Sequence, residues 1–83
     1  ILNKLVPVAE LEKETMNLAT RLANGPPVAQ RLARLLVYKN LEVDLETALT
    51  MESACISICL GTEDNKEGIK AFAEKRQPIF KGK

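Results

Sequence analysis

Helix-breaking residues divide this chain into four stretches, and that division limits the folds it can adopt. The breaks lie at Gly25-Pro26-Pro27, between Asn40 and Asp44, and at Gly61, and Pro78 ends the last stretch. Glycine commonly follows the last turn of a helix, and proline cannot continue one. Between the breaks, apolar residues recur at helical spacing. The sequence therefore predicts an all-α fold of about four helices, preceded by an extended lead-in over residues 1–7 and followed by an extended C-terminal tail.

The expected helices run over residues 8–24, 27–40, 45–60 and 62–76. Asp44 has the side chain of an N-cap for the third helix. Asp64 is followed three residues later by Glu67, which is the form of a capping box for the fourth. Pro78 disfavours helical geometry at the residue before it. We therefore expect the fourth helix to end near Arg76.

The third expected helix is apolar around most of its circumference. One stripe comprises Leu45, Ala48, Leu49, Glu52, Ile56, Cys59 and Leu60. A second comprises Met51, Ala54, Cys55 and Ile58. A helix that is apolar on most sides is buried on most sides, yet a chain this short buries only roughly 60–65% of its unfolded surface. We therefore expect one stripe to face a partner or a domain outside residues 1–83.

The charge balance and the apolar pattern exclude several classes of protein. Twelve basic and eleven acidic residues give a net charge of +1, which argues against a dedicated nucleic-acid binder. No apolar run approaches the roughly 18 residues of a membrane span, and no signal-peptide pattern is present. The chain opens at Ile1 rather than methionine, which indicates an excised piece. Two cysteines without a disulfide framework suit a reducing compartment, the cytoplasm or, in a eukaryote, the mitochondrial matrix.

Cys55 and Cys59 lie one helical turn apart and could be read as a metal or redox pair. Metal sites usually need three or four ligands, and the chain has no histidine. Two side chains that leave one helix in the same direction also suit a disulfide poorly. We interpret both as core cysteines and expect neither a metal site nor a tightly bound cofactor.

Glu52 stands in an apolar stripe, where burial could raise its pKa and make it a general base. No histidine or second acid is placed beside it by the sequence. We interpret it as a structural acid that meets Arg76 or the N-terminus of a neighbouring helix. No residue is therefore predicted to be catalytic.

Phe72, Lys75 and Arg76 combine an aromatic ring with two cations on one short helix and its exit. The ring could stack on a nucleobase, and lysine could meet a phosphate as a point charge. In the structural alternative, Phe72 belongs to the core and the cations interact with the helix dipole. From the residues alone the structural alternative is favoured.

The order of the residues adds a resemblance. The closing run D-x-x-E-G-x-x-A-F-x-E-K-R-x-P-x-F-x-G, from Asp64 to Gly82, carries its most specific part, and residues 3–7 and 25–29 add weaker support. Over essentially its whole length the chain resembles the C-terminal end of the enoyl-CoA hydratase/isomerase family, the crotonases.

The resemblance implies a helical region that follows a spiral catalytic core, drives assembly into a homotrimer or a hexamer of two trimers, and covers the acyl-CoA pocket. It also implies that Phe72 and Lys75 contact the adenine and phosphate end of coenzyme A, whose thioester is the substrate. The catalytic glutamates and the oxyanion hole belong to the core, so residues 1–83 are expected to form a single helical domain, inactive alone and part of a longer chain.

Two other interpretations remain open at this point. The first is a free-standing helical module for protein–protein interaction that keeps the family pattern. The second is a nucleic-acid binder that uses Arg31, Arg34 and Lys39 on the second helix, although Tyr38 is the only aromatic residue among them and acidic residues follow closely. A solvated helix face explains these cations better.

Overall fold

The computed structural model describes residues 2–83, and Ile1 of the expected lead-in lies outside the described residues. Four helices follow one another along the chain: α1 (Val8–Ala23), α2 (Pro27–Lys39), α3 (Leu45–Leu60) and α4 (Glu63–Ala73). Over residues 2–83 there is no strand. The predicted all-α fold of four helices is thus confirmed, and the first three helices lie within a residue of the expected bounds.

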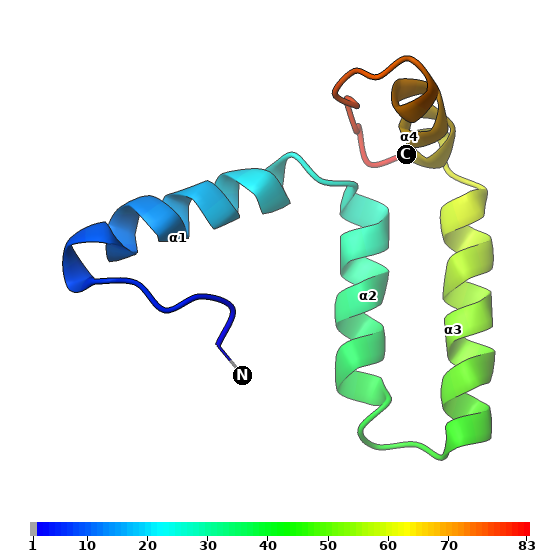
Figure 1. Cartoon of the computed structure of the whole chain (residues 1–83). Coiled ribbons are helices and arrows are strands. Elements are labelled where there is room, and N and C mark those ends of the chain that lie inside the picture. The colour runs from blue at the N-terminus through cyan, green and yellow to red at the C-terminus, as the bar shows by residue number, and fades with distance from the viewer. Residues whose placement is uncertain (1) are drawn as a thin grey trace.

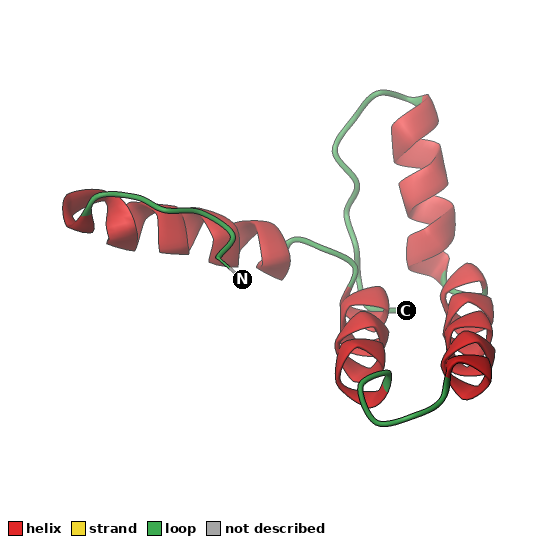
Figure 2. Ribbon diagram, turned by 60° about the horizontal axis from the view of Figure 1, so that its bottom comes forward, coloured by secondary structure: helices red, strands yellow, loops and turns green. Residues whose placement is uncertain are grey.

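The helices form an open arrangement rather than a bundle (Figure 1). Helices α2 and α3 run antiparallel, side by side, and pack against each other as a hairpin. Helix α1 extends away from this hairpin, and α4 lies across its end (Figure 2). The chain measures 44 × 37 × 18 Å. Because a helix with its side chains is already about 10–12 Å thick, a body only 18 Å deep encloses few side chains.

The packed face of α3 draws on both stripes predicted from the sequence. Its covered residues are Ala48, Met51, Cys55 and Cys59, and only Cys55 is buried, at 8% exposure. On the facing side, α2 contributes Leu32 and Leu36. The two-stripe description was therefore wrong in its detail, because one neighbouring helix covers only a narrow seam along the line where the helices meet.

Much of the apolar surface of α3 lies uncovered on either side of that seam. Each of five large apolar residues of α3 has more than half of its surface exposed: Leu45, Leu49, Ile56, Ile58 and Leu60. Helix α1 is similar, since Leu11, Leu18 and Leu22, which recur at helical spacing, are all exposed. The expectation that α3 presents apolar surface beyond what this chain covers is met on both flanks of the helix.

The lead-in returns along α1 instead of continuing away from it (Figure 2). Lys4 and Glu14 form an ion pair with a 2.7 Å Nζ–Oε2 distance, which ties the two segments together. None of the four helices is both long and apolar enough to cross a membrane, as judged over the described residues.

The N-terminus of α3 has the predicted cap. The Asp44 carboxylate accepts a hydrogen bond from the Thr47 N–H at 2.9 Å and another from the Thr47 hydroxyl at 2.7 Å. These bonds favour the charged carboxylate, so the N–H of Thr47 above all holds the pKa of Asp44 below its usual value. One of the donors that the first turn leaves unpaired is thereby satisfied.

The two ends of α4 differ from the prediction. Thr62 is the N-cap, because its hydroxyl accepts a hydrogen bond from the Asn65 N–H at 3.0 Å. The predicted capping box of Asp64 with Glu67 was wrong, since both carboxylates bond to the C-terminal tail instead. At its other end α4 stops at Ala73 rather than near Arg76, for a reason that lies in the backbone of the next turn.

Candidate functional site

The C-terminus of α4 is closed by a tight hydrogen-bonded turn. The Arg76 N–H donates to the Ala71 carbonyl at 3.0 Å, and the Lys75 N–H donates to the Phe72 carbonyl at 3.2 Å. This pair of bonds is a Schellman motif, in which the residue after the C-cap adopts a left-handed conformation. That residue is Lys75, with φ of +53°. Its geometry ends the helix early and turns the chain back toward α4.

Lysine is an unusual occupant of that position. Glycine is the common choice, because a Cβ atom is crowded in the left-handed region. Within residues 2–83, Lys75 is the only non-glycine residue with positive φ. Residues held in such sparsely populated conformations cluster at ligand clamps and active sites. The observed backbone outlier therefore marks Lys75 as a functional candidate independently of any family pattern.

Phe72 and Lys75 both present their side chains to solvent. Phe72 is 88% exposed and Lys75 is exposed as well. The alternative in which Phe72 belongs to the core is therefore wrong for this chain: in this turn the small, 1% exposed Ala71 faces inward, and its neighbour faces out. An uncovered aromatic ring next to an uncovered ammonium can stack on a flat base while meeting an anion.

Arg76 is engaged inside the turn. Its Nη1 and Nη2 atoms donate to the two carboxylate oxygens of Glu67 at 2.6 and 3.0 Å, and its Nε donates to Glu74 at 2.6 Å. A further bond at 3.2 Å joins Nη1 to the Gln77 carbonyl. The predicted meeting of Arg76 with Glu52 is therefore wrong, because Glu67 and Glu74 occupy the guanidinium.

This network changes the protonation of its members. The Arg76 guanidinium, followed by the Ile79 N–H at 2.9 Å, lowers the pKa of Glu67 from 4.5 to about 2. Hydrogen bonds to Glu67 and then Glu74 raise the pKa of Arg76. Both shifts favour the charged forms, so the pair stays ionised near neutral pH.

The C-terminal tail (residues 78–83) is strapped along α4 by two carboxylates from that helix. Buried Asp64 accepts bonds from the N–H groups of Lys81 at 2.7 Å and Gly82 at 2.8 Å, and Glu67 accepts one from Ile79. The Asp64 N–H donates in turn to the Lys83 carbonyl at 3.0 Å. The tail thus supplies the hydrogen-bond partners that water would otherwise give to Asp64 and Glu67, and these bonds fix the path of the tail along α4.

The folded tail closes one side of an apolar pocket of about 400 Å³. The Phe80 ring covers Gly68, where an ideal Cβ would lie 3.6 Å from the ring edge, and Gly82 adopts φ of +78° beside Pro27. The lining residues come from α2, α3, α4 and the tail: Pro26, Ala29, Cys59, Thr62, Asp64, Asn65, Gly68, Ile69, Phe72 and Phe80. Of the two predicted ligand-binding residues, Phe72 lines this pocket and Lys75 does not.

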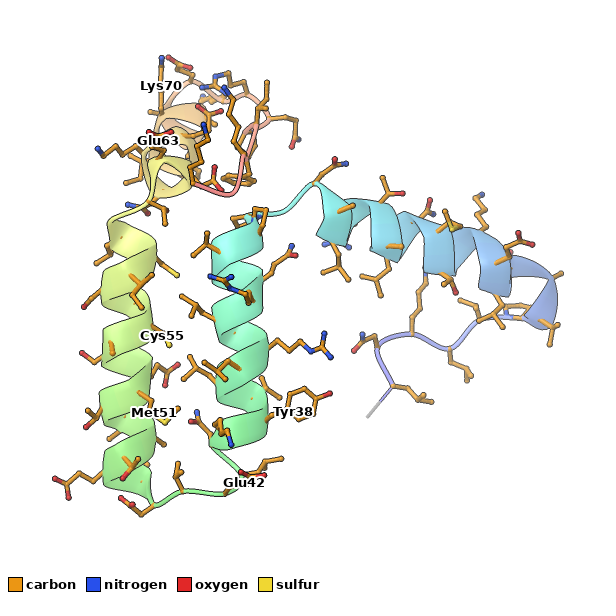
Figure 3. All side chains as sticks on the ribbon, turned by 180° about the vertical axis from the view of Figure 1, so that it is seen from behind. Tyr38, Glu42, Met51, Cys55, Glu63 and Lys70 are labelled. Atoms are coloured by element: carbon orange, nitrogen blue, oxygen red, sulfur yellow. The ribbon has the colours of Figure 1, made fainter. Side chains whose placement is uncertain are left out.

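The other predicted candidates are placed elsewhere. Cys55 and Cys59 are free thiols on the seam between α2 and α3, and Figure 3 labels Cys55 there. Glu52 is exposed and lines a groove of about 210 Å³ between the same helices. Over the described part of the chain, no group of three or more His, Cys, Asp or Glu side chains could hold a metal ion.

Two of the basic residues of α2, Arg34 and Lys39, have local partners. The Arg34 guanidinium lies over the Tyr38 ring at 5.9 Å, and Lys39 pairs with Glu42 at 3.3 Å. Tyr38 and Glu42 lie at one end of the α2–α3 hairpin, whereas Glu63 and Lys70 of α4 lie at the other (Figure 3). Arg34 and Lys39 therefore do not join Lys75 in a single basic surface.

Sequence reasoning missed the residues that shape this site, chiefly Glu67 and Phe80. Pro78 was the available signal, because a chain that must leave the helix two residues after Arg76 can fold back on its own acids. Nothing in local spacing identifies which acid it meets. The pocket could not be predicted either, since its lining residues lie up to 54 positions apart, from Pro26 to Phe80.

Comparison with known proteins agrees with the resemblance. A family model described as enoyl-CoA hydratase/isomerase matches residues 1–83. Methylglutaconyl-CoA hydratase of Mus musculus is 41% identical over 70 residues, which cover 84% of this chain and 22% of that protein. A short-chain-enoyl-CoA hydratase of Clostridium acetobutylicum is 34% identical over 77 residues, 93% of this chain and 30% of that protein.

Solved structures show the same relation. The crystal structure of an enoyl-CoA hydratase from Bacillus anthracis superposes with a TM-score of 0.88 at 40% identity, over 94% of this chain and 30% of that one. Human enoyl-CoA hydratase domain-containing protein 3 gives a TM-score of 0.83 at 39% identity, over 95% and 31%. The chain thus matches a partial region, less than a third, of each of these proteins. By sequence and by fold, it belongs to the enoyl-CoA hydratase/isomerase family.

Proposed function

We propose that this chain is the C-terminal region of an enzyme that acts on a coenzyme A thioester, where it binds the nucleotide end of the ligand and helps to assemble subunits. One observation carries the binding role: an exposed Phe72 ring stands one turn from Lys75, which a strained, hydrogen-bonded backbone turn holds in place. Membership in a family named for enoyl-CoA chemistry supports the class of ligand.

The two side chains suit the two parts of a nucleotide. Stacking of a base on an aromatic ring contributes about 1–3 kcal/mol, and the exposed face of Phe72 is free for it. Lysine attracts phosphate as a point charge without a fixed geometry, so Lys75 suits the mobile phosphates of coenzyme A. The Phe72 ring also borders the apolar pocket.

The assembly role rests on apolar surface. Monomeric proteins rarely expose contiguous apolar patches of more than a few hundred Å², and both α1 and α3 carry large uncovered side chains. In our proposal the N-terminal core of the same polypeptide covers part of this surface, and neighbouring subunits of a homotrimer, or of a hexamer of two trimers, cover the rest. The enzyme would reside in the cytoplasm or the mitochondrial matrix.

The chemistry belongs to the rest of the enzyme. Such an enzyme would add water across the double bond of an enoyl-CoA or move that bond along the acyl chain. Acid–base carboxylates and oxyanion-hole donors for either reaction would come from the core, since electrostatic stabilisation of the enolate is the expected largest catalytic contribution. Residues 1–83 alone would therefore bind without turnover.

Calorimetric titration of the full-length protein with coenzyme A and with pantetheine, which lacks the nucleotide, tests this proposal. Phe72→Ala and Lys75→Ala should each weaken coenzyme A binding by about tenfold, since 1.4 kcal/mol corresponds to that factor. Pantetheine binding should not change. Lys66→Ala, another exposed lysine of α4, is the matched control. Unchanged coenzyme A affinity in both variants would refute the binding role.

A further inference from the structure

The turn after α4 contains two neighbouring cations, Lys75 and Arg76, and the structure distinguishes their roles. Arg76 makes four hydrogen bonds, two to Glu67, one to Glu74 and one to the Gln77 carbonyl. A guanidinium has five N–H donors, so few remain for a ligand. Lys75 has no side-chain bond of this kind among the described residues. The cation left for an anionic ligand is therefore Lys75.

The Arg76 bonds also hold the backbone on both sides of Lys75. Through Glu67 they reach back to the middle of α4, and through Gln77 they reach the residue that follows the turn. The same Glu67 carboxylate accepts the Ile79 N–H at 2.9 Å. Lys75 thus lies between a helix and a tail that the Glu67 carboxylate joins to each other close to the turn.

Such bracing matters because the conformation of Lys75 is unfavourable by itself. A left-handed backbone destabilises an L-residue by about 1–2 kcal/mol, so an unbraced Lys75 would populate other conformations. Each of them would direct the lysine side chain elsewhere relative to Phe72, whose backbone is held in α4. Charge-assisted, bidentate bonds are the strongest and most directional available to counter this.

We propose that Glu67 and Arg76 are positioning residues for ligand binding: their ion pair holds Lys75 in its left-handed conformation and so sets the direction in which its side chain leaves the backbone relative to the Phe72 ring. This inference rests on the proposed function and adds two residues that touch no ligand. It explains why the ion pair spans nine positions of sequence instead of one helical turn. The chemical class of ligand is a nucleotide diphosphate attached to a thiol-bearing arm.

A double-mutant cycle in the full-length protein tests the proposal, with coenzyme A and pantetheine as ligands. Glu67→Ala should weaken coenzyme A binding by about three- to tenfold, the range expected when one flexible side chain loses its pre-organisation. Pantetheine binding should be unaffected. In a Lys75→Ala background, Glu67→Ala should weaken coenzyme A binding by no more than about twofold, because the group through which it acts is gone.

Conservative variants separate positioning from folding. Glu67→Gln removes the charge but keeps an acceptor for Ile79, and Arg76→Lys keeps the charge but loses the fork. Both should lower coenzyme A affinity at a temperature where thermal unfolding shows them, like the Glu46→Gln control, to be fully folded, and they carry the test if Glu67→Ala does not fold.

The outcomes distinguish the two proposals. Equal loss of coenzyme A and pantetheine binding, or an undiminished effect of Glu67→Ala in the Lys75→Ala background, would make the pair merely structural and overturn the positioning role. No loss in any Glu67 or Arg76 variant would overturn it too. If Lys75→Ala itself leaves coenzyme A binding intact, the proposed function fails first, and the positioning role falls with it.

Discussion

At the scale of single residues, the turn after α4 places a lysine where the backbone favours glycine. The left-handed conformation of Lys75, with φ of +53°, is unfavourable by itself, and the surrounding hydrogen bonds maintain it. Natural sequences depart from local conformational preferences mainly at functional sites. The exposed Phe72 ring lies one turn before Lys75, so the two side chains form a pair of functional candidates. Stability and ligand binding should therefore respond in opposite directions to one substitution.

Lys75→Gly tests that opposition. Glycine relieves the strain of about 1–2 kcal/mol but adds freedom to the unfolded chain, so the free energy of unfolding should rise by about 0.5 kcal/mol. Coenzyme A affinity should fall as in Lys75→Ala. Urea unfolding and calorimetric titration of the full-length protein measure the two quantities. A variant that is less stable than wild type would contradict the strain at this position.

The ion pair of Glu67 should make stability depend on pH in an acidic window. The pKa of Glu67 is about 2 in the folded chain against an ordinary 4.5. A lowered folded-state pKa stabilises the fold fully above the unfolded-state pKa, and this contribution is lost as the pH falls from about 4.5 toward 2. Wild type and Glu67→Gln should therefore differ in urea midpoint at pH 6 and converge near pH 2. A constant difference across that range would disprove the assignment.

At the scale of elements, local signals located most helix ends. Proline at positions 7 and 27, the Asp44 cap and Gly61 mark starts and stops that the structure reproduces. The end of α4 escaped prediction because its left-handed residue is not a glycine. Asp64 and Glu67 were assigned to a capping box because their spacing fits one, but tertiary contact with the tail uses both carboxylates.

Asp64 should control whether the tail stays on α4. Asp64→Ala removes the acceptor for the Lys81 and Gly82 N–H groups, which then exchange with water. Because each lost hydrogen bond to a charged group is worth about 1.5–3 kcal/mol, amide exchange at Lys81 and Gly82 should accelerate by at least tenfold. Hydrogen-exchange mass spectrometry of the full-length protein measures it. Asp44→Ala, which removes a carboxylate cap elsewhere, should leave these amides protected; if both variants behave alike, the strap is not specific.

At the scale of the whole molecule, the chain is an open set of helices in which Cys55 and Ala71 are the only buried apolar side chains of the described residues. Its fold class followed from helical periodicity, and its site residues Phe72 and Lys75 followed from the family pattern, although their contact with a ligand stays a prediction. The pocket and the ion pair of Glu67 with Arg76 could not be predicted, because both depend on how the tail folds back. Apolar periodicity predicts where each helix lies but not which face of it a neighbouring helix covers. In α3, the covered residues come from both predicted stripes.

The isolated chain should be helical yet unable to remain a rigid monomer. Its large exposed side chains on α1 and α3 would drive self-association or leave the helices loosely packed, since exposed apolar patches of this kind seek partners. Sedimentation velocity at several concentrations, with far- and near-ultraviolet circular dichroism, measures mass and packing. A concentration-independent monomer with cooperative unfolding would contradict this expectation.

The return of the tail to the start of α4 has a practical use. The Lys83 carbonyl is bonded to Asp64 in the first turn, and Gly82 lies beside Pro27 of α2. Phe72 and Lys75 lie at the opposite end of α4, about 15 Å away at 1.5 Å per residue. A linker attached through the Lys83 side chain would therefore hold the chain on a sensor surface with Phe72 and Lys75 at the far end of α4.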